Sequence, residues 1–230
     1  AGANYSINFT GADFTITEKT LNVTVDSGQN KVFGDPDPVF TFQVTGFANG
    51  DVKSILTGAL ARVAGENVGT YAINLGTLEA GTNYTINYTG GDFEITPALV
   101  TEITFDDGTF SFDGLAKSLA ISGTLPSGTS VSYTNNSRTD VGTQEVTATI
   151  TGSNFTTLVL TADLTITPAT ITGITFPNGS FVFDGTAKSL AISGTLPVGT
   201  SVAYTNNSRT NVGTQEVTAT ITGSGKSTKA

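Results

Sequence analysis

Residues 113–153 read DGLAKSLAISGTLPSGTSVSYTNNSRTDVGTQEVTATITGS, and residues 184–224 repeat this stretch as DGTAKSLAISGTLPVGTSVAYTNNSRTNVGTQEVTATITGS. The two copies differ at only four of 41 positions. Self-similarity at a fixed period indicates repeated modules. The copies lie 71 residues apart, and the same spacing joins Thr96-Pro97 to Thr167-Pro168, so each repeat ends at an Ile-Thr-Pro-Ala boundary.

A second kind of repeat lies toward the N-terminus. Residues 1–17 read AGANYSINFTGADFTIT, and residues 80–96 read AGTNYTINYTGGDFEIT. Together the two repeats predict four segments: the closing strands of a preceding unit at 1–18, a first-type module at 19–97, a second-type module at 98–168, and an incomplete second-type repeat at 169–230. The last segment stops before its counterpart of residues 155–167, so we expect the natural protein to extend past both ends.

Apolar and polar residues alternate with a period of two inside the repeats. Between residues 157 and 167 one parity is apolar: Leu158, Leu160, Ala162, Leu164 and Ile166. Threonine, a β-branched residue that suits a pleated surface, fills most of the other parity. This alternation gives each strand one buried and one wet face. The predicted fold is therefore all-β, with tandem small antiparallel β-sandwich modules of immunoglobulin-like type in an extended array.

One stretch of the first-type module departs from this pattern. Between Asp51 and Leu60 the apolar residues follow a helical spacing, and Asp51 could cap a helix there. Such a helix, packed across a curled sheet, would make this module β-grasp-like. The other interpretation is an irregular loop whose Ile and Leu side chains plug the sandwich, which Gly58 favours.

Composition argues against several classes of function. The net charge is −9, from 19 acidic and 10 basic residues without a basic run, which disfavours nucleic acid as a partner. The chain has no histidine and no cysteine, the residues that most often serve as general base, thiol nucleophile or zinc ligand. No apolar stretch approaches the roughly 18 residues that span a bilayer. We therefore expect a protein that is not an enzyme, uses no cofactor and inserts no part of this segment into a membrane.

An ordered set of motifs resembles a known family of modules. The first-type module carries FGDPDP at 33–38, VGTY at 68–71 and FEITP at 93–97, and the second type carries FDG at 112–114 and VGT at 141–143. This set resembles the MBG modules, the "mostly beta, glycine-rich" repeats of bacterial surface proteins. Many members have tyrosine where this chain has Phe33.

The resemblance implies a function without showing one, because fold does not fix activity. MBG arrays typically belong to large secreted adhesins, common in Bacteroidota, including gliding-motility adhesins exported by the type IX system. The chain is thus expected to be a structural stalk of an extracellular adhesin on the bacterial cell surface, mediating extension and adhesion. Its partners would be neighbouring repeats of the same chain, with surface glycans or the substratum beyond them.

The repeated loop TNNSRT is the candidate ligand site. Its candidate residues are Asn135, Asn136 and Arg138, with Asn206, Asn207 and Arg209 in the second copy. Amide and guanidinium groups suit sugar hydroxyls, and repetition would give avidity. The alternative function is therefore an array of carbohydrate-binding modules. Against it, the flanking strands are just as alike, as recent duplication would leave them, and no tryptophan offers a stacking platform.

Two further chemistries are candidates for stiffening the array. Asp35 and Asp37 flank Pro36 and could hold Ca²⁺ through carboxylate oxygens, although aspartate is equally favoured in turns for local backbone hydrogen bonds. Lys117 and Lys188 occupy matching positions and could form Lys–Asn isopeptide bonds, each with loss of one ammonia.

Overall fold

The computed structural model describes residues 3–48 and 50–223 of the 230-residue chain. Its contacts form two compact units, residues 1–99 with 153–156 and residues 100–152 with 157–230. The described residues contain strands and one short 3-10 helix but no α-helix, which confirms the all-β prediction. None of their helical segments has the length and apolar character needed to cross a membrane. The end of the predicted last repeat, residues 224–230, lies outside the described residues.

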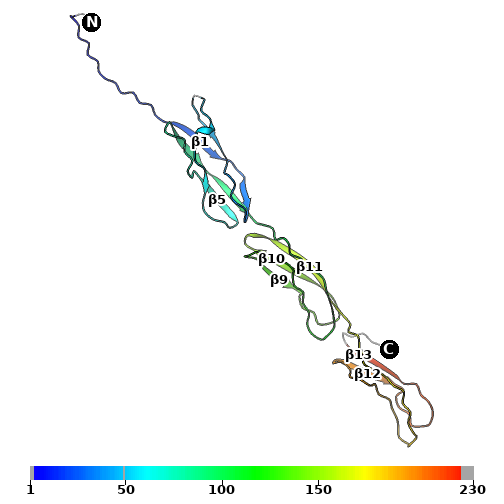
Figure 1. The fold of residues 1–230 in the computed structure, drawn as a ribbon. Coiled ribbons are helices and arrows are strands. Elements are labelled where there is room, and N and C mark those ends of the chain that lie inside the picture. Colours follow the sequence, from blue (N-terminus) through cyan, green and yellow to red (C-terminus); the bar gives the residue numbers. More distant parts are fainter. Residues whose placement is uncertain (1–2, 49, 224–230) are drawn as a thin grey trace. The chain divides into compact units, whose positions relative to one another are not determined.

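Two sheets form the first-type module (Figure 1). Its strands are β1 (Lys19–Val25), β2 (Gln29–Val32), β3 (Phe42–Thr45), β4 (Ala61–Arg62), β5 (Gly69–Asn74), β6 (Tyr84–Thr89) and β7 (Gly91–Thr96). One sheet has the order β3-β1-β6 and the other the order β2-β7-β5-β4. Side chains from both sheets meet in one core, as in a sandwich.

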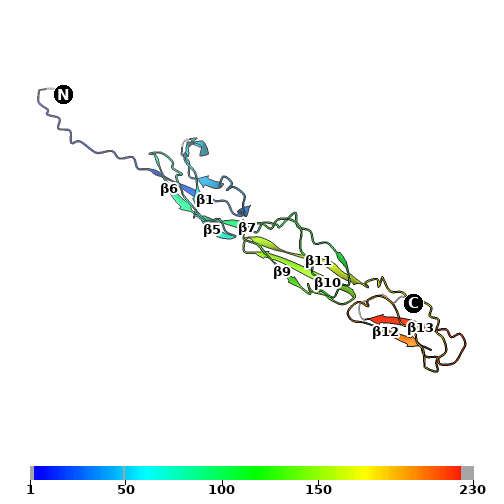
Figure 2. The same ribbon diagram turned by 60° about the horizontal axis from the view of Figure 1, so that its bottom comes forward.

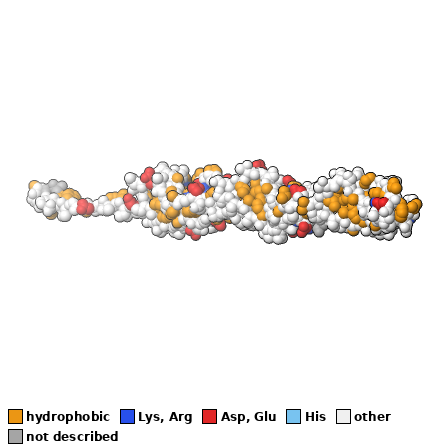
Figure 3. Space-filling view, turned by 90° about the horizontal axis from the view of Figure 1, so that it is seen from below, with side chains coloured by type: hydrophobic (Ala, Val, Ile, Leu, Met, Phe, Trp, Pro, Cys, Tyr) orange, Lys and Arg blue, Asp and Glu red, His pale blue; other side chains and the backbone are white. Residues whose placement is uncertain are grey.

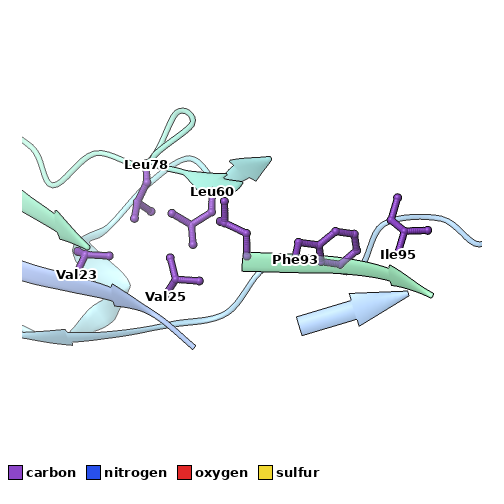
Figure 4. Packing of buried hydrophobic residues seen from close by; sticks show 7 residues of the cluster. Val23, Val25, Leu60, Leu78, Phe93 and Ile95 are labelled. Carbon is purple, nitrogen blue, oxygen red and sulfur yellow. The ribbon is translucent and has the colours of Figure 1, made fainter. Parts of the chain in front are cut away.

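The core of this module follows from the alternation in the sequence. In β1, Leu21, Val23 and Val25 are buried while the residues between them are exposed. Phe93 and Ile95 of β7 are fully buried and meet Val23 and Val25 in the same cluster (Figure 4). Fully burying one such side chain stabilises the fold by about 1.5–3 kcal/mol.

The predicted helix between Asp51 and Leu60 is reduced to one 3-10 turn, η1 (Lys53–Ile55). Gly58 explains the early stop, because its φ is +78° and a Cβ there would lie 2.0 Å from the Thr77 carbonyl oxygen. Leu60 is buried in the sandwich core, as the irregular-loop interpretation predicts. Without a helix across either sheet in the described residues, the β-grasp alternative does not hold.

A single four-stranded sheet organises residues 98–168 (Figure 2). Its strands are β8 (Gly108–Ser111), β9 (Ser130–Thr134), β10 (Gly142–Gly152) and β11 (Phe155–Thr167), in the order β8-β11-β10-β9. Val146 and Ile150 of β10 and Leu164 and Ile166 of β11 are buried, on the parity that the sequence predicts. Val159, which breaks the alternation, is exposed.

The turn between β10 and β11 belongs by its contacts to the first unit. Asn154 Oδ1 accepts a hydrogen bond from the Val68 amide at 2.8 Å, and its Nδ2 donates to Asn67 Oδ1 at 3.0 Å. Phe155 packs edge-to-face on Phe33, with 5.5 Å between ring centroids. A segment distant in sequence therefore completes this unit.

Residues 169–223 form a smaller sheet than their near-identical counterpart. Among the described residues only β12 (Thr200–Thr205) and β13 (Thr218–Gly223) are strands here, and they pair antiparallel. They correspond to β9 and to the second half of β10, 71 residues earlier.

The sheets are mixed rather than wholly antiparallel, which corrects the prediction in this respect. β1 pairs with β6, β2 with β7, and β8 with β11, all in parallel. Each parallel pair joins an early strand of its module to a late one, because parallel neighbours need a long crossover connection. Alternation reports which face of a strand is buried and carries no information about strand direction.

Candidate functional site

The TNNSRT loops join two strands in each second-type repeat. In the complete module the loop follows β9 and leads into β10, and in the last repeat it follows β12. Asn135 and Asn206 both have φ of +58°, the left-handed region that asparagine tolerates better than most residues. These asparagines therefore have a conformational role in turning the chain.

The second asparagine of each loop is a structural link to another part of its module. The Asn136 Oδ1 accepts a hydrogen bond from the Leu119 amide, and the Asn136 Nδ2 donates to the Leu119 carbonyl, both at 2.7 Å. Asn207 makes the same pair with Leu190 at 2.6 and 2.7 Å. The side-chain amide of the asparagine thus bonds both the N–H and the C=O of a residue 17 positions earlier, as a neighbouring strand would.

The arginine of each loop is also bonded internally. Arg138 Nε donates to the Asp140 carbonyl at 2.9 Å, and its Nη2 donates to the Val141 carbonyl at 3.0 Å. The guanidinium lies against Gly142, where a Cβ would come within 2.2 Å of Nη2. Arg209 repeats these bonds with Asn211 and Val212.

These contacts leave little of the predicted ligand surface available. Of the six candidate residues, only Asn135 and Asn206 have side chains without a hydrogen bond inside the described part of the chain. Any sugar would compete with backbone groups for Asn136 and Arg138. Ligand binding by these loops stays a prediction, and their geometry explains the residues without it.

Asp37 belongs to a charge cluster, defined here as Lys31, Asp37, Arg62 and Glu66. Arg62 holds the Asp37 carboxylate with two hydrogen bonds, from Nε at 2.7 Å and from Nη2 at 3.0 Å. Lys31 Nζ lies 2.8 Å from Asp37 Oδ1, the oxygen that also accepts from Arg62 Nη2, and 2.5 Å from Glu66. Arg62 also pairs with Glu66 at 2.7 Å. Two cations thus share two carboxylates.

The cations of the cluster are buried and the carboxylates are more open. The side chains of Lys31 and Arg62 are 4% and 5% exposed, against 35% for Asp37 and 69% for Glu66. The Arg62 guanidinium also lies over the rings of Tyr71 and Phe93, with 5.1 and 5.4 Å to the centroids. The hydrogen bonds from Arg62, with help from Lys31, lower the pKa of Asp37 from 3.8 to about 2.

This geometry disfavours calcium at Asp35 and Asp37. A divalent cation at Asp37 would have to displace both Lys31 and Arg62 from its carboxylate. In the described ranges no group of three or more histidine or acidic side chains is arranged to hold a metal. The calcium prediction stays untested. The cluster itself had no signal in the sequence, because Arg62 lies 25 positions after Asp37 and Glu66 lies 35 positions after Lys31.

The two lysines considered for isopeptide bonds sit in ion pairs. Lys117 Nζ lies 2.6 Å from Asp113 Oδ2, and Lys188 Nζ lies 2.6 Å from Asp184 Oδ2. The hydrogen bond from Lys188 is the main cause that lowers the pKa of Asp184 to about 2, and the one from Lys117 acts likewise on Asp113. The neighbour of each lysine is therefore an ionised carboxylate, which is a poor acceptor for an amine.

A hollow lies in the last repeat. It has a volume of about 350 Å³ and is lined by residues 179–183, 186, 188–190, 207–215 and 217. Hydrophobic side chains gather at the surface of this repeat (Figure 3). Phe181 and Phe183 on its wall are 55% and 61% exposed. Among the described residues this repeat has no counterpart of β11, and the hollow itself was not predicted.

Comparison with known proteins identifies two domains. Residues 21–94 match the family model described as MBG domain (YGX type), and residues 101–170 match a second model described as MBG domain. A search of curated proteins found no match.

Proposed function

Because this chain belongs to the family of MBG-domain repeat modules, we propose that it is a load-bearing stalk segment of a secreted bacterial cell-surface adhesin. In this role it works by length and by resistance to pulling, and it carries out no chemistry. Its place is outside the cell, between an anchor and an adhesive contact. Two matched modules in series, followed by a partial third, suit that task.

The observation that carries this proposal is the parallel pairing of the terminal strands in each complete module. In residues 19–97, the first strand β1 pairs in parallel with β6, and the last strand β7 pairs in parallel with β2. In residues 98–168, the first strand β8 pairs in parallel with the last strand β11. Tension on the two ends of a module pulls such strands past one another, so their hydrogen bonds are loaded together rather than one at a time.

Core packing adds to this resistance. β11 cannot slide without withdrawing Leu164 and Ile166, both almost fully buried, from the core. In the first module the same holds for Phe93 and Ile95 of β7. Moving one such side chain into water costs about 1.5–3 kcal/mol.

Single-molecule pulling tests this function, and the absence of native cysteine allows force to be applied at chosen points. Cysteine handles at Thr101 and Thr170, both exposed, load β8 and β11 in shear. Handles at the exposed, directly paired Ser130 and Thr151 open β9 and β10 from their ends. We expect a severalfold higher unfolding force for the first pair. Equal forces from both pairs would contradict a load-bearing role.

The cellular part of the proposal needs a second test. Antibodies against this segment should label intact cells of the bacterium that makes it. Deletion of residues 19–168 in frame should weaken attachment under flow while the protein still reaches the surface. Labelling only after the cells are opened would refute the surface location.

A further inference from the structure

Three motifs of the first-type module come together at a place that the stalk function does not explain. Phe33 begins FGDPDP, Val68 begins VGTY, and Ala98 ends the Ile-Thr-Pro-Ala boundary. All three residues are half-buried, and each contacts the turn between β10 and β11, at Asn154 or Phe155. These motif residues therefore form a surface that holds a segment of the following repeat.

Strands of the first-type module hold this surface in place. The Phe33 amide donates to the Thr96 carbonyl at 2.9 Å, which continues the pairing of β2 with β7. The Tyr71 hydroxyl donates to the Asn67 carbonyl at 2.7 Å, which fixes the backbone just before β5. Ala98 lies two residues after the end of β7. Phe33, Asn67, Val68 and Ala98 are together called the socket.

The side chain of Asn154 bonds the socket. Its Oδ1 accepts from the Val68 amide at 2.8 Å, and its Nδ2 donates to Asn67 Oδ1 at 3.0 Å. The two partners lie 86 and 87 positions away in the sequence. An asparagine that only shaped its own turn would bond the backbone close to it. Asn154 is therefore a docking residue.

Backbone bonds and a ring contact complete the docking. The Ala98 amide donates to the Asn154 carbonyl at 3.0 Å, and the Thr156 amide donates to the Ala98 carbonyl at 2.9 Å. The rings of Phe155 and Phe33 meet at 72°, an edge-to-face geometry that stabilises beyond the burial of the rings. The turn is thus held by four hydrogen bonds and one aromatic contact.

We propose that the first-type module has a socket for the β10–β11 turn of the second-type module, and that docking of this turn couples the folding of the two modules. The partner that fits is a turn with asparagine followed by an aromatic residue. The asparagine amide supplies an acceptor for the Val68 N–H and a donor for the Asn67 side chain, and the ring packs on Phe33. This inference does not depend on the stalk function.

The coupling follows from where the turn lies. Gly152 ends β10 and Phe155 begins β11, so both strands hold the turn in shape. Unfolding of these strands withdraws the turn, and unfolding of the first-type module destroys the socket. Either event loses the same contacts, so each module stabilises the other by the same factor.

Asn154→Ala in the full chain tests the proposal. Asn154 has no positive φ, so alanine fits its backbone, and the substitution removes the two side-chain bonds to the socket. Amide hydrogen exchange of β5 and β7, measured where it reports unfolding of the whole module, should become about five- to tenfold faster. By reciprocity, exchange of β9 and β10 should accelerate by a similar factor.

Ser153→Ala is the matched control, because Ser153 is the exposed neighbour of Asn154 in the same turn. It should leave exchange in both modules within about twofold of the parent.

A double-mutant cycle on the two rings tests the aromatic contact. Phe33→Ala and Phe155→Ala should each accelerate exchange of β7, since each removes the contact. The double variant should fall short of the product of the two single effects by about threefold or more, because the contact can be lost only once.

Three outcomes would overturn the proposal. In the first, Asn154→Ala changes exchange no more than Ser153→Ala does. In the second, the acceleration by Asn154→Ala is confined to one of the two modules, which would show that the turn serves that module alone. In the third, the effects of the two ring variants multiply fully, so that Phe33 and Phe155 act independently.

Discussion

The second-type repeats at residues 98–167 and 169–223 have almost the same sequence, but in the described residues only the first, the finished module, has all four strands; the second is the unfinished one. Their loops are alike in detail: the asparagine link, the arginine contacts and the lysine–aspartate pair occur in both. Their sheets differ, because one has four strands and the other has two among its described residues. A stretch of chain can therefore keep its local structure and still lose strands.

The difference separates local from non-local causes of structure. The loops depend on residues at most 21 positions apart, and both copies contain all of them. Strand β8 instead depends on β11, whose paired residues lie 56 positions later in the chain. Strand propensity is largely a measure of packing against neighbouring strands. Residues 179–182 have nearly the residues of β8 but not its neighbour, and they are not a strand.

The largest effect should come from supplying the missing strand. Replacing residues 224–230 with the sequence of residues 153–167 should turn residues 179–182 and 213–217 into strands. The added strand would bury several apolar side chains on both sides of the core, which predicts a gain on the order of 5 kcal/mol in the stability of this module. Hydrogen exchange at the amides of these two ranges measures the gain.

A graft with Leu164 and Ile166 replaced by aspartate is its control. It has the same length and register but cannot fill the core, so it should leave exchange at residues 179–182 fast. Equal protection from both grafts would show that chain length, rather than packing, decides the difference between the two repeats.

Weakening the last strand of the complete module should lower the stability of that module toward that of the unfinished one. Leu164→Ala removes a fully buried side chain from β11 and should lower the free energy of unfolding of this module by about 2–5 kcal/mol. Val159→Ala on the same strand is the control, because Val159 is exposed and its loss should change stability by less than about 0.5 kcal/mol. Denaturant titration of both variants measures the contrast, and similar losses would refute the burial assignment.

The loops provide a smaller and more specific test. Asn136→Ala leaves the amide and the carbonyl of Leu119 without their partner and should lower stability by about 1–3 kcal/mol. Asn207→Ala removes the same bonds from the unfinished repeat, where we expect faster local exchange at Leu190 and little change in the main unfolding transition.

Ser137→Ala, at an exposed neighbouring position, is the control for both loop variants. A glycan screen of the same proteins separates a structural role from a binding role. If Asn136→Ala abolished sugar binding at unchanged stability, the loop would be a ligand site after all.

Sequence reasoning succeeded where short-range pattern determines the outcome. The parity of residues such as Leu164 predicted the buried face of β11, and the same alternation in β1 and β10 placed their core residues. Repeat spacing divided the chain into modules and an incomplete last repeat, and this division stays a prediction. These features depend only on neighbours along the chain and on comparison of the chain with itself.

The rest depends on which distant residues meet. Alternation could not show that β8 and β11 run in parallel. The polar residues of the TNNSRT loop looked like ligand groups. Their sequence could not show that Asn136 already has a partner, because that partner is the backbone of Leu119, 17 residues away. Asp37 looked like a metal ligand or a turn residue, because its partner Arg62 lies 25 positions later, in β4.

The smallest predicted effect concerns the charge cluster of the first-type module. The pKa of Asp37 is about 2 in the folded state and 3.8 ordinarily, so the stabilisation is fully present above about pH 4 and is lost as the pH falls toward 2. Solvent reaches about a third of the Asp37 side chain, which limits the expected loss to about 1 kcal/mol. Asp37→Asn should remove this acid-dependent part of the stability of residues 19–97, and leave the acid response of the second-type repeats unchanged because their exposed Asp113 and Asp184 pairs are intact. Acid titrations of unfolding, followed by hydrogen exchange in each module separately, measure both effects. If the variant and the parent lost stability equally between pH 4 and 2 in the first module, Arg62 and Lys31 would not be holding the Asp37 carboxylate as the geometry indicates.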